Sequence, residues 1–186
     1  MTVASVEISP TSFENVFFEV DQIQAVADRL VDQIGIEVDV HIEVDESTPL
    51  AKVKLTSLDP VTLDVESGAL EDNKRPRQFG ERQATDSLGR MLFKVADRLD
   101  PSFGAPPLDE QPALAHAVAW DTYAAGRLTR LGYASQRQRR VYTFELRHGF
   151  TDVALAAFEQ LWTAESLTWP EIVAISDETR AVIDAA

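Results

Sequence analysis

The stretch QAVADRLVDQIGIEVDVHIEVD, residues 24–45, changes its hydrophobic period at Gly35. Before this glycine, apolar residues recur three or four positions apart, which is the spacing of one face of an α-helix. After it, apolar and polar residues alternate from Ile36 to Asp45, as in a β-strand with one buried face and one exposed face. A helix followed directly by such a strand predicts a domain of the α+β class.

The helical spacing extends back towards the N-terminus, so the sequence predicts an N-terminal helix over residues 11–34. Thr11 and Glu14 have the spacing of a capping box, and glycine at position 35 commonly ends a helix. The predicted apolar face consists of Phe13, Val16, Phe17, Val20, Ile23, Ala27, Leu30, Val31 and Ile34.

Two further alternating segments follow the first strand, at residues 51–55 and 61–65. The connections are short and polar, which predicts a three-stranded antiparallel meander. If the first two strands pair, Lys52 and Lys54 share a face with the acidic residues of strand 36–45. Residues 67–80 have no period and predict an exposed loop, whose basic residues are Lys74, Arg75 and Arg77.

The helical period returns at residues 81–100, where a second helix is predicted. Residues 101–112 hold four of the nine prolines and predict a linker. Beyond it we expect an all-helical half of about four helices, at residues 113–131, 136–148, 152–164 and 169–184. Ser135 with Gln138 and Thr168 with Glu171 have capping-box spacing. The expected organisation is an α+β domain at 1–100, a linker at 101–112 and a helical domain at 113–186, packed on the first.

The two last helices are rich in apolar residues, for which core packing is the default expectation. These residues are Phe150, Val153, Leu155, Phe158, Leu161, Trp162, Leu167, Trp169, Ile172, Val173 and Ile175.

The net charge of −14 is unevenly distributed. Residues 1–73 carry 16 acidic and three basic side chains, residues 74–147 carry eight and 13, and the last 39 residues have a net charge of −6. No apolar run reaches the length of a membrane span, no secretory leader is recognisable, and there is no cysteine. We therefore expect a cytoplasmic protein without a membrane segment. Arginine outnumbers lysine 13 to four, which suggests a bacterial source with a GC-rich genome.

The helix at 81–100 reads Ala84-Thr85-Asp86-Ser87-Leu88-Gly89-Arg90 and contains no histidine. The element order of residues 11–100 resembles the minimal zincin-like metallopeptidase scaffold, in which a helix and a small sheet precede the helix bearing HExxH. The likeness covers about half the chain and concerns element order only. It implies a scaffold of that kind without the metal chemistry, because two imidazoles one turn apart are needed to bind the zinc ion.

Metal and cofactor motifs are missing from the sequence. The three histidines, His41, His116 and His148, are far apart, and none forms an HxH, HxxxH or HxxE pattern. The carboxylates around His41 predict a solvated acidic face, with a weak divalent-cation site as the alternative. No phosphate-binding glycine loop, serine elbow or nucleophilic cysteine is present, so we expect no cofactor and no covalent catalysis.

The strongest candidate site is a cluster of arginines and aromatic residues. Six arginines fall within the 21 residues from Arg127 to Arg147, which contain one acidic residue. Guanidinium groups beside aromatic rings suit phosphates, stacked bases and acidic peptide segments. The candidate contact residues are His116, Trp120, Tyr123, Arg127, Arg130, Arg137, Arg139, Arg140 and Arg147.

Four roles compete for this cluster. The arginines can pair internally with carboxylates of residues 1–73 or of the last helix. They can instead form a surface for a protein partner or a homo-oligomer, which is the role that we predict, for a non-catalytic interaction module. An enzyme or degenerate metal-free scaffold would use Arg127, Arg130, Arg137 and Arg140 to bind an anionic small molecule. Nucleic acid is the least favoured partner, because a charge of −14 repels phosphates.

Overall fold

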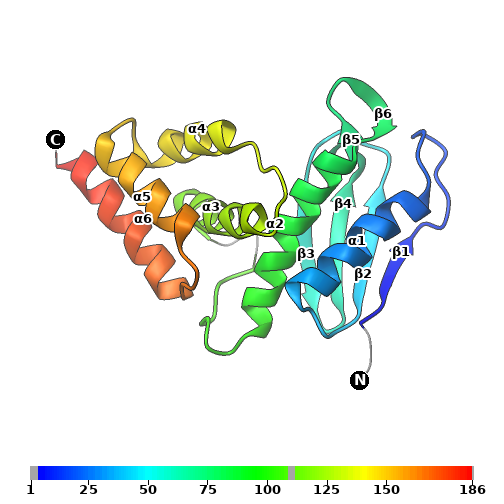
Figure 1. Ribbon diagram of the computed structural model, residues 1–186, viewed down its shortest axis with the longest axis horizontal. Coiled ribbons are helices and arrows are strands. Elements are labelled where there is room, and N and C mark those ends of the chain that lie inside the picture. Colours follow the sequence, from blue (N-terminus) through cyan, green and yellow to red (C-terminus); the bar gives the residue numbers. More distant parts are fainter. Residues whose placement is uncertain (1–3, 109–111, 186) are drawn as a thin grey trace. The chain divides into compact units, whose positions relative to one another are not determined.

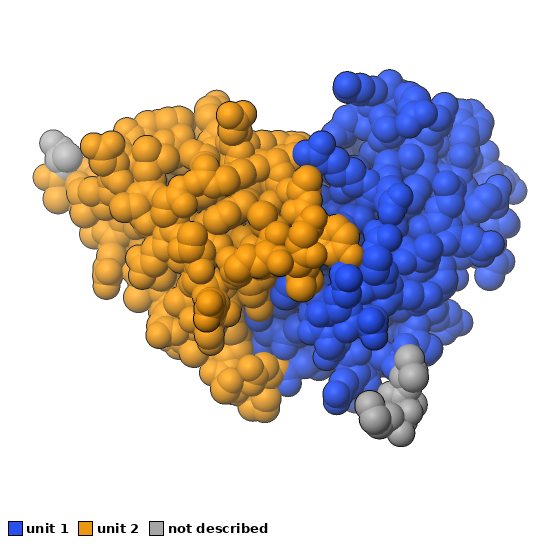
Figure 2. Space-filling view, in the orientation of Figure 1, with its two compact units in different colours: residues 1–99 blue, residues 100–186 orange. Residues whose placement is uncertain are grey.

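The computed structural model describes residues 4–108 and 112–185. The chain divides into two compact units, residues 1–99 and 100–186, which are coloured blue and orange in Figure 2. Residues 109–111, part of the predicted linker, lie outside the described residues.

Unit 1 contains a mixed four-stranded sheet in the order β1-β2-β4-β3. Strands β1 and β2 are parallel, β2 and β4 are parallel, and β3 is antiparallel to β4. The strands are β1 (Val6–Ser9), β2 (Val40–Asp45), β3 (Val53–Leu58) and β4 (Val61–Glu66). The predicted α+β class is confirmed, but the predicted three-stranded antiparallel meander is wrong.

Burial explains this strand order. Val61, Leu63 and Val65 of β4 are at most 1% exposed, so this strand belongs in the middle of the sheet. Strand β3 has fewer fully buried side chains and lies at the edge. Its Lys54 is opposite Asp64 of β4 and not opposite a residue of β2. The alternation along each strand predicts its buried face correctly but carries no information about which strand is its neighbour.

Strand β1 precedes the first helix and was not predicted. It has four residues, of which Ile8 is buried, so its alternation is too short to recognise in the sequence. Its parallel pairing with β2 makes β1-α1-β2 a crossover unit, in which the helix returns the chain to the same end of the sheet.

Helices α1 (Val20–Ile34) and α2 (Glu81–Leu99) cover the apolar face of this sheet (Figure 1). Gly35 ends α1 in the left-handed conformation, with φ of 80°, as predicted. The start of α1 was predicted at residue 11, with a Thr11–Glu14 capping box, and both predictions are wrong. The helix begins at Val20, where Glu19 and Gln22 form the capping box.

The carboxylate of Glu46 accounts for the later start of α1. It accepts hydrogen bonds from the backbone N–H groups of Glu14 and Asn15, at 2.9 and 2.5 Å. These N–H groups are therefore held by a side chain distant in sequence, and the segment before Glu19 keeps an irregular conformation although its apolar spacing is helical.

The predicted loop at 67–80 is partly ordered into secondary structure. It forms a short 3₁₀ helix (Ser67–Ala69) and the two-stranded sheet of β5 (Glu71–Asp72) and β6 (Arg75–Phe79). Its basic side chains at 74, 75 and 77 are exposed, but the backbone is held because Asp72 accepts the N–H of Lys74 at 2.8 Å.

The described residues of unit 2 form four helices, in agreement with the prediction. They are α3 (Leu114–Arg130), α4 (Arg137–His148), α5 (Asp152–Thr163) and α6 (Trp169–Asp184). Thr168 and Glu171 form the predicted capping box. The box predicted for Ser135 and Gln138 is wrong: Gln136 is the N-cap of α4, and buried Ser135 hydrogen-bonds Thr129.

The core of unit 2 begins inside the segment predicted as a linker. Phe103 is 4% exposed, and its ring stacks on Trp120 with centroids 5.7 Å apart. Its carbonyl oxygen accepts the N–H of Trp169 at 2.7 Å, so this segment is tied to the start of α6. Among the described residues, no helix is both long and apolar enough to cross a bilayer.

Candidate interaction surface

Trp120 and Tyr123, two of the candidate aromatic residues, belong to the core of unit 2. Trp120 is 1% exposed and packs between Phe103 and Trp169, with ring centroids 5.2 Å from the latter. Tyr123 is 3% exposed, and its hydroxyl accepts the N–H of Leu167 at 3.1 Å. Neither ring is available to stack on a base or a peptide.

Tyr123, Gly126 and Arg130 are spaced as one face of α3, and this face holds the end of α5. The guanidinium of Arg130 donates to the carbonyl oxygens of Trp162 and Ala164, both at 2.6 Å. Gly126 permits the close approach, because a Cβ atom there would lie 2.1 Å from the Trp162 oxygen. Arg130 thus satisfies carbonyl groups that the end of a helix leaves without intrahelical partners.

Three other candidate arginines also have partners within unit 2. Arg127 lies over the Tyr123 ring, 4.0 Å from its centroid. Arg137 pairs with Glu159 of α5 and lies over the Phe158 ring. Arg140 pairs with Asp121 of α3 at 3.2 Å. The carboxylate partner of Arg137 belongs to α5 and that of Arg140 to α3, so both of these ion pairs lie within unit 2.

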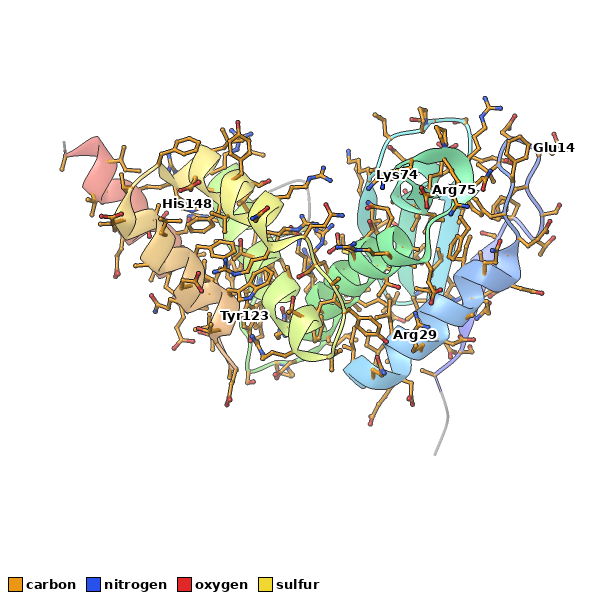
Figure 3. All side chains as sticks on the ribbon, turned by 45° about the horizontal axis from the view of Figure 1, so that its top comes forward. Glu14, Arg29, Lys74, Arg75, Tyr123 and His148 are labelled. Atoms are coloured by element: carbon orange, nitrogen blue, oxygen red, sulfur yellow. The ribbon has the colours of Figure 1, made fainter. Side chains whose placement is uncertain are left out.

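The two histidines of unit 2 contact helix α6. His116 Nε2 lies 2.6 Å from the carboxylate of Asp177, and its ring meets Trp169 edge-on. His148, which Figure 3 labels, is completely buried and stacks on Phe144, with ring centroids 3.9 Å apart. Its Nδ1–H donates to the Phe144 carbonyl oxygen, and its Nε2 accepts from the Ser176 hydroxyl at 2.8 Å.

The His148–Ser176 pair has the geometry of a base and a nucleophile, but both residues are 0% exposed. A substrate cannot reach a hydroxyl that no solvent reaches, so the pair is structural and joins α4 to α6. Burial lowers the pKa of His148, and the nearby Arg180 and His116 act in the same direction.

The exposed side of α4 is where candidate residues remain accessible. Arg139 and Arg147 are exposed, and the ion pairs within the described parts of the chain include neither of them. Between them Tyr142 is 57% exposed and Leu146 53% exposed. Phe150, just past the helix end, is 63% exposed and its ring centroid lies 6.0 Å from that of Tyr142. We call Arg139, Tyr142, Leu146, Arg147 and Phe150 the α4 face.

Three members of the α4 face were missing from the predicted site, namely Tyr142, Leu146 and Phe150. Core packing was predicted for Phe150, Val153 and Leu155, and this is wrong because all three are exposed. Of the same set, Phe158, Leu161, Trp162, Ile172 and Ile175 are buried as predicted. The signal in the sequence was the four-residue spacing of residues 142, 146 and 150. This spacing puts them on one side of the helix, opposite the buried Phe144 and His148.

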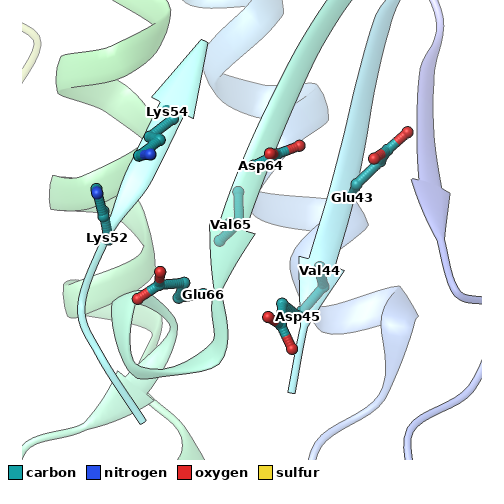
Figure 4. A pocket seen from close by; sticks show the side chains of 8 residues that line it. All are labelled: Glu43, Val44, Asp45, Lys52, Lys54, Asp64, Val65 and Glu66. Carbon is teal, nitrogen blue, oxygen red and sulfur yellow. The ribbon is translucent and has the colours of Figure 1, made fainter. Parts of the chain in front are cut away.

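A second group of charged side chains lies on the open face of the sheet in unit 1. Glu43 and Asp45 of β2 lie beside Asp64 and Glu66 of β4, with Lys52 and Lys54 on the far side of β4 (Figure 4). These side chains line an open hollow of about 410 Å³. His41 does not line this hollow. Its Nδ1 atom lies 3.1 Å from a carboxylate oxygen of Glu7.

Lys52 and Lys54 lie on the acidic face, but the pairing of the first two predicted strands, on which this expectation depended, does not occur. Their neighbouring strand is β4. Across the residues that the structure describes, no group of three or more histidine, aspartate or glutamate side chains is arranged to hold a metal ion.

Comparisons with known proteins identify no relative of this chain. No protein-family model, no curated protein and no solved structure matches it. Its function must accordingly be argued from its own surface.

Proposed function

We propose that this chain is a non-catalytic protein-interaction module that binds its partner through the α4 face. The observation that carries the proposal is the exposure of Tyr142, Leu146 and Phe150, at 57, 53 and 63%. Large apolar side chains grouped on a surface are typical of binding sites, and aromatic residues with arginine are enriched where binding energy concentrates.

The charges of the α4 face indicate the chemistry of the partner. Arg139 and Arg147 flank the apolar side chains and are exposed. Their planar guanidinium groups suit bidentate contacts with carboxylates. The expected partner is a protein segment that presents a large apolar side chain surrounded by acidic ones.

Helix α4 is held firmly enough to present a defined surface. Its inner side is anchored by the stacked Phe144 and His148, and the Phe144 ring meets Phe158 of α5 at 5.8 Å. The Arg137–Glu159 and Arg140–Asp121 pairs join α4 to two neighbouring helices. A rigid surface loses less conformational entropy on binding, which favours association.

The competing functions draw less support from the same contacts. An enzyme for an anionic small molecule would need Arg127, Arg130, Arg137 and Arg140 as ligand contacts, and each of them already has a partner inside unit 2. For nucleic acid, the exposed arginines of α4 are outweighed by the net charge of −14, which repels a phosphate backbone.

Affinity capture with three versions of the protein tests the proposal. The wild type is compared with the double variant Tyr142→Ser/Phe150→Ser and with the control Leu155→Ser, whose substituted side chain is 40% exposed on α5. We expect a protein that the wild type and the control retain and that the double variant loses. After purification, that protein should bind the double variant at least about tenfold more weakly in calorimetric titration, a difference of about 1.4 kcal/mol.

Equal capture by the double variant and the wild type would contradict a role for the α4 face. Circular dichroism and a melting curve establish that the double variant is folded, which is expected because the substituted side chains are exposed.

A further inference from the structure

Phe17 is the most exposed of the large apolar side chains in the described chain, at 73%. Its neighbours Val16 and Phe18 are 8 and 3% exposed, so the segment before α1 buries the residues on either side and directs Phe17 outward. The Phe18 ring packs against Phe13 and Phe79, with centroids 5.6 and 5.8 Å away.

The segment that presents Phe17 is held by long-range hydrogen bonds. The N–H of Phe17 donates to the carbonyl oxygen of Arg77 at 2.7 Å. The carboxylate of Glu46 accepts the N–H groups of Glu14 and Asn15. Figure 3 shows Glu14 on this segment, ahead of α1. An aromatic side chain held in a fixed exposed position loses little entropy when it is buried by a partner, which is the property of an interface anchor.

Acidic side chains surround Phe17 in the sequence. Glu14, Glu19 and Asp21 lie within four residues of it, and all three are exposed. No basic residue occurs before Arg29 in the sequence, although the fold brings the backbone of the exposed Arg77 to Phe17. We call Glu14, Phe17, Glu19 and Asp21 the Phe17 knob.

The Phe17 knob has the chemistry that the proposed function requires of a partner. The α4 face offers apolar side chains between two exposed arginines, and the knob offers one exposed aromatic side chain with three exposed carboxylates within four residues of it in the sequence. We infer that the partner of the α4 face is the Phe17 knob of a second copy of this chain. This inference rests on the proposed function and identifies the protein that binds the α4 face.

Such a contact is heterologous, because each copy uses a different surface. A single aromatic anchor with its neighbours buries less than the roughly 1,200 Å² of a stable interface, so the association is weak and reversible. We therefore expect the average molecular mass to rise as the protein concentration increases from micromolar to millimolar.

Sedimentation velocity of the full chain tests this contact with two complementary variants. Phe17→Ser removes the anchor and keeps the α4 face, whereas Tyr142→Ser/Phe150→Ser removes the α4 face and keeps the anchor. We expect each variant alone to remain monomeric at concentrations where the wild type associates. An equimolar mixture should recover a complex, because one intact knob then meets one intact face.

Matched controls remove exposed apolar side chains elsewhere. Leu50→Ser in unit 1 and Leu155→Ser on α5 replace residues that are 61 and 40% exposed. Both controls should associate like the wild type if the contact is specific.

A charge exchange provides an independent arm of the experiment. Arg139→Glu/Arg147→Glu and Glu14→Arg/Asp21→Arg should each weaken association, and their mixture should restore it. Glu19 is left unchanged because it caps α1. Arg82→Glu and Glu37→Arg, at exposed positions of unit 1, are the controls for altered net charge.

Each contrary outcome has a distinct meaning. A wild type that stays monomeric throughout overturns the self-association inference, while the proposed function is still tested by capture of another protein. Association that Phe17→Ser leaves intact but Tyr142→Ser/Phe150→Ser abolishes also overturns the inference and keeps the α4 face as the interface. If the α4 variants change neither association nor capture, the proposed function itself fails.

Discussion

Arg130 and Arg139 lie nine residues apart in one basic cluster and have different surroundings. Arg130 donates to two carbonyl oxygens at the end of α5, whereas Arg139 is exposed on α4. The residue type is the same in both cases. What differs is whether acceptor groups lie within reach of the guanidinium, and that depends on residues more than thirty positions away.

Replacing these two arginines should separate their roles. Arg130→Ala leaves the carbonyl oxygens of Trp162 and Ala164 without their charged donor, so we expect the free energy of unfolding to fall by about 1–2 kcal/mol. Arg130→Lys should recover only part of the loss, because an ammonium group cannot reproduce the two-pronged geometry. Chemical denaturation measures both.

Arg139→Ala is the matched control in this experiment. It should change the free energy of unfolding by no more than about 0.5 kcal/mol, as is usual for an exposed side chain. A loss for Arg139→Ala as large as that for Arg130→Ala would contradict the assignment.

His148 makes stability depend on pH. Its pKa in the folded protein is lowered below the usual 6.5 by burial. Arg180 and His116 add to this effect, while the hydrogen bond to the Phe144 carbonyl oxygen and the charge of Asp177 oppose it. As pH falls below about 6.5, the unfolded chain takes up a proton that the folded chain does not, so stability decreases. We expect His148→Gln to show a smaller loss of melting temperature than the wild type between neutral pH and pH 5.

His41 supplies the comparison for this pH effect. It is partly exposed and lies beside Glu7, so His41→Gln should retain the pH dependence attributed to His148. If His148→Gln and the wild type lose stability in parallel as pH falls, burial of His148 is not the cause.

At the scale of secondary structure, α4 is positioned by charged contacts with α3 and α5. Arg140 and Asp121 are 13 and 21% exposed, which places their ion pair well inside the surface. The Arg137–Glu159 pair is about half exposed and is expected to contribute less, about 0–1 kcal/mol.

Reversal of Arg140 tests this attachment of α4. Arg140→Glu brings a second carboxylate to Asp121, and we expect a clear decrease in melting temperature. The double variant Arg140→Glu/Asp121→Arg should regain part of the loss, because it restores opposite charges at the same positions. An unchanged melting temperature for Arg140→Glu would show that the pair contributes nothing to holding α4.

The ends of the helices show which boundaries the local sequence can predict and which it cannot. The end of α1 at Gly35 and the capping box of α6 were predictable, because both depend on residues within one turn of the helix end. The start of α1 was not predictable, because Glu46, more than thirty residues away, binds the backbone of the preceding segment. The order of the strands likewise depends on how deeply β3 and β4 are buried relative to each other. The sequence of one strand alone does not show this difference.

At the scale of the whole molecule, the aromatic core cluster described for unit 2 runs from Phe103 to Ile175. This suggests that the fragment 100–186 has what it needs to fold by itself. The fragment 113–186, which follows the sequence-based boundary, lacks Phe103 and its contacts with Trp120 and Trp169.

Comparison of these two fragments tests the contribution of Phe103. We expect 100–186 to unfold cooperatively, and 113–186 to be less stable by about 3–5 kcal/mol or not to fold, as for removal of a buried phenylalanine. The substitution Phe103→Ala in the full chain should reproduce the loss. Equal melting curves for the two fragments would assign residues 101–112 to a linker after all.

The sequence by itself determined the α-helices and strands β2, β3 and β4, most of their ends and the side of these three strands that is buried, whereas it did not reveal β1, β5 or β6. These properties follow from periodicity and capping, which act between residues close together in the chain. Tertiary structure alone decided that Phe17 is exposed while Phe18 is buried, and that Arg130 is engaged while Arg139 is not. The reason is that exposure and pairing depend on segments brought together from distant parts of the chain, and neighbouring residues of identical chemistry can then meet different surroundings.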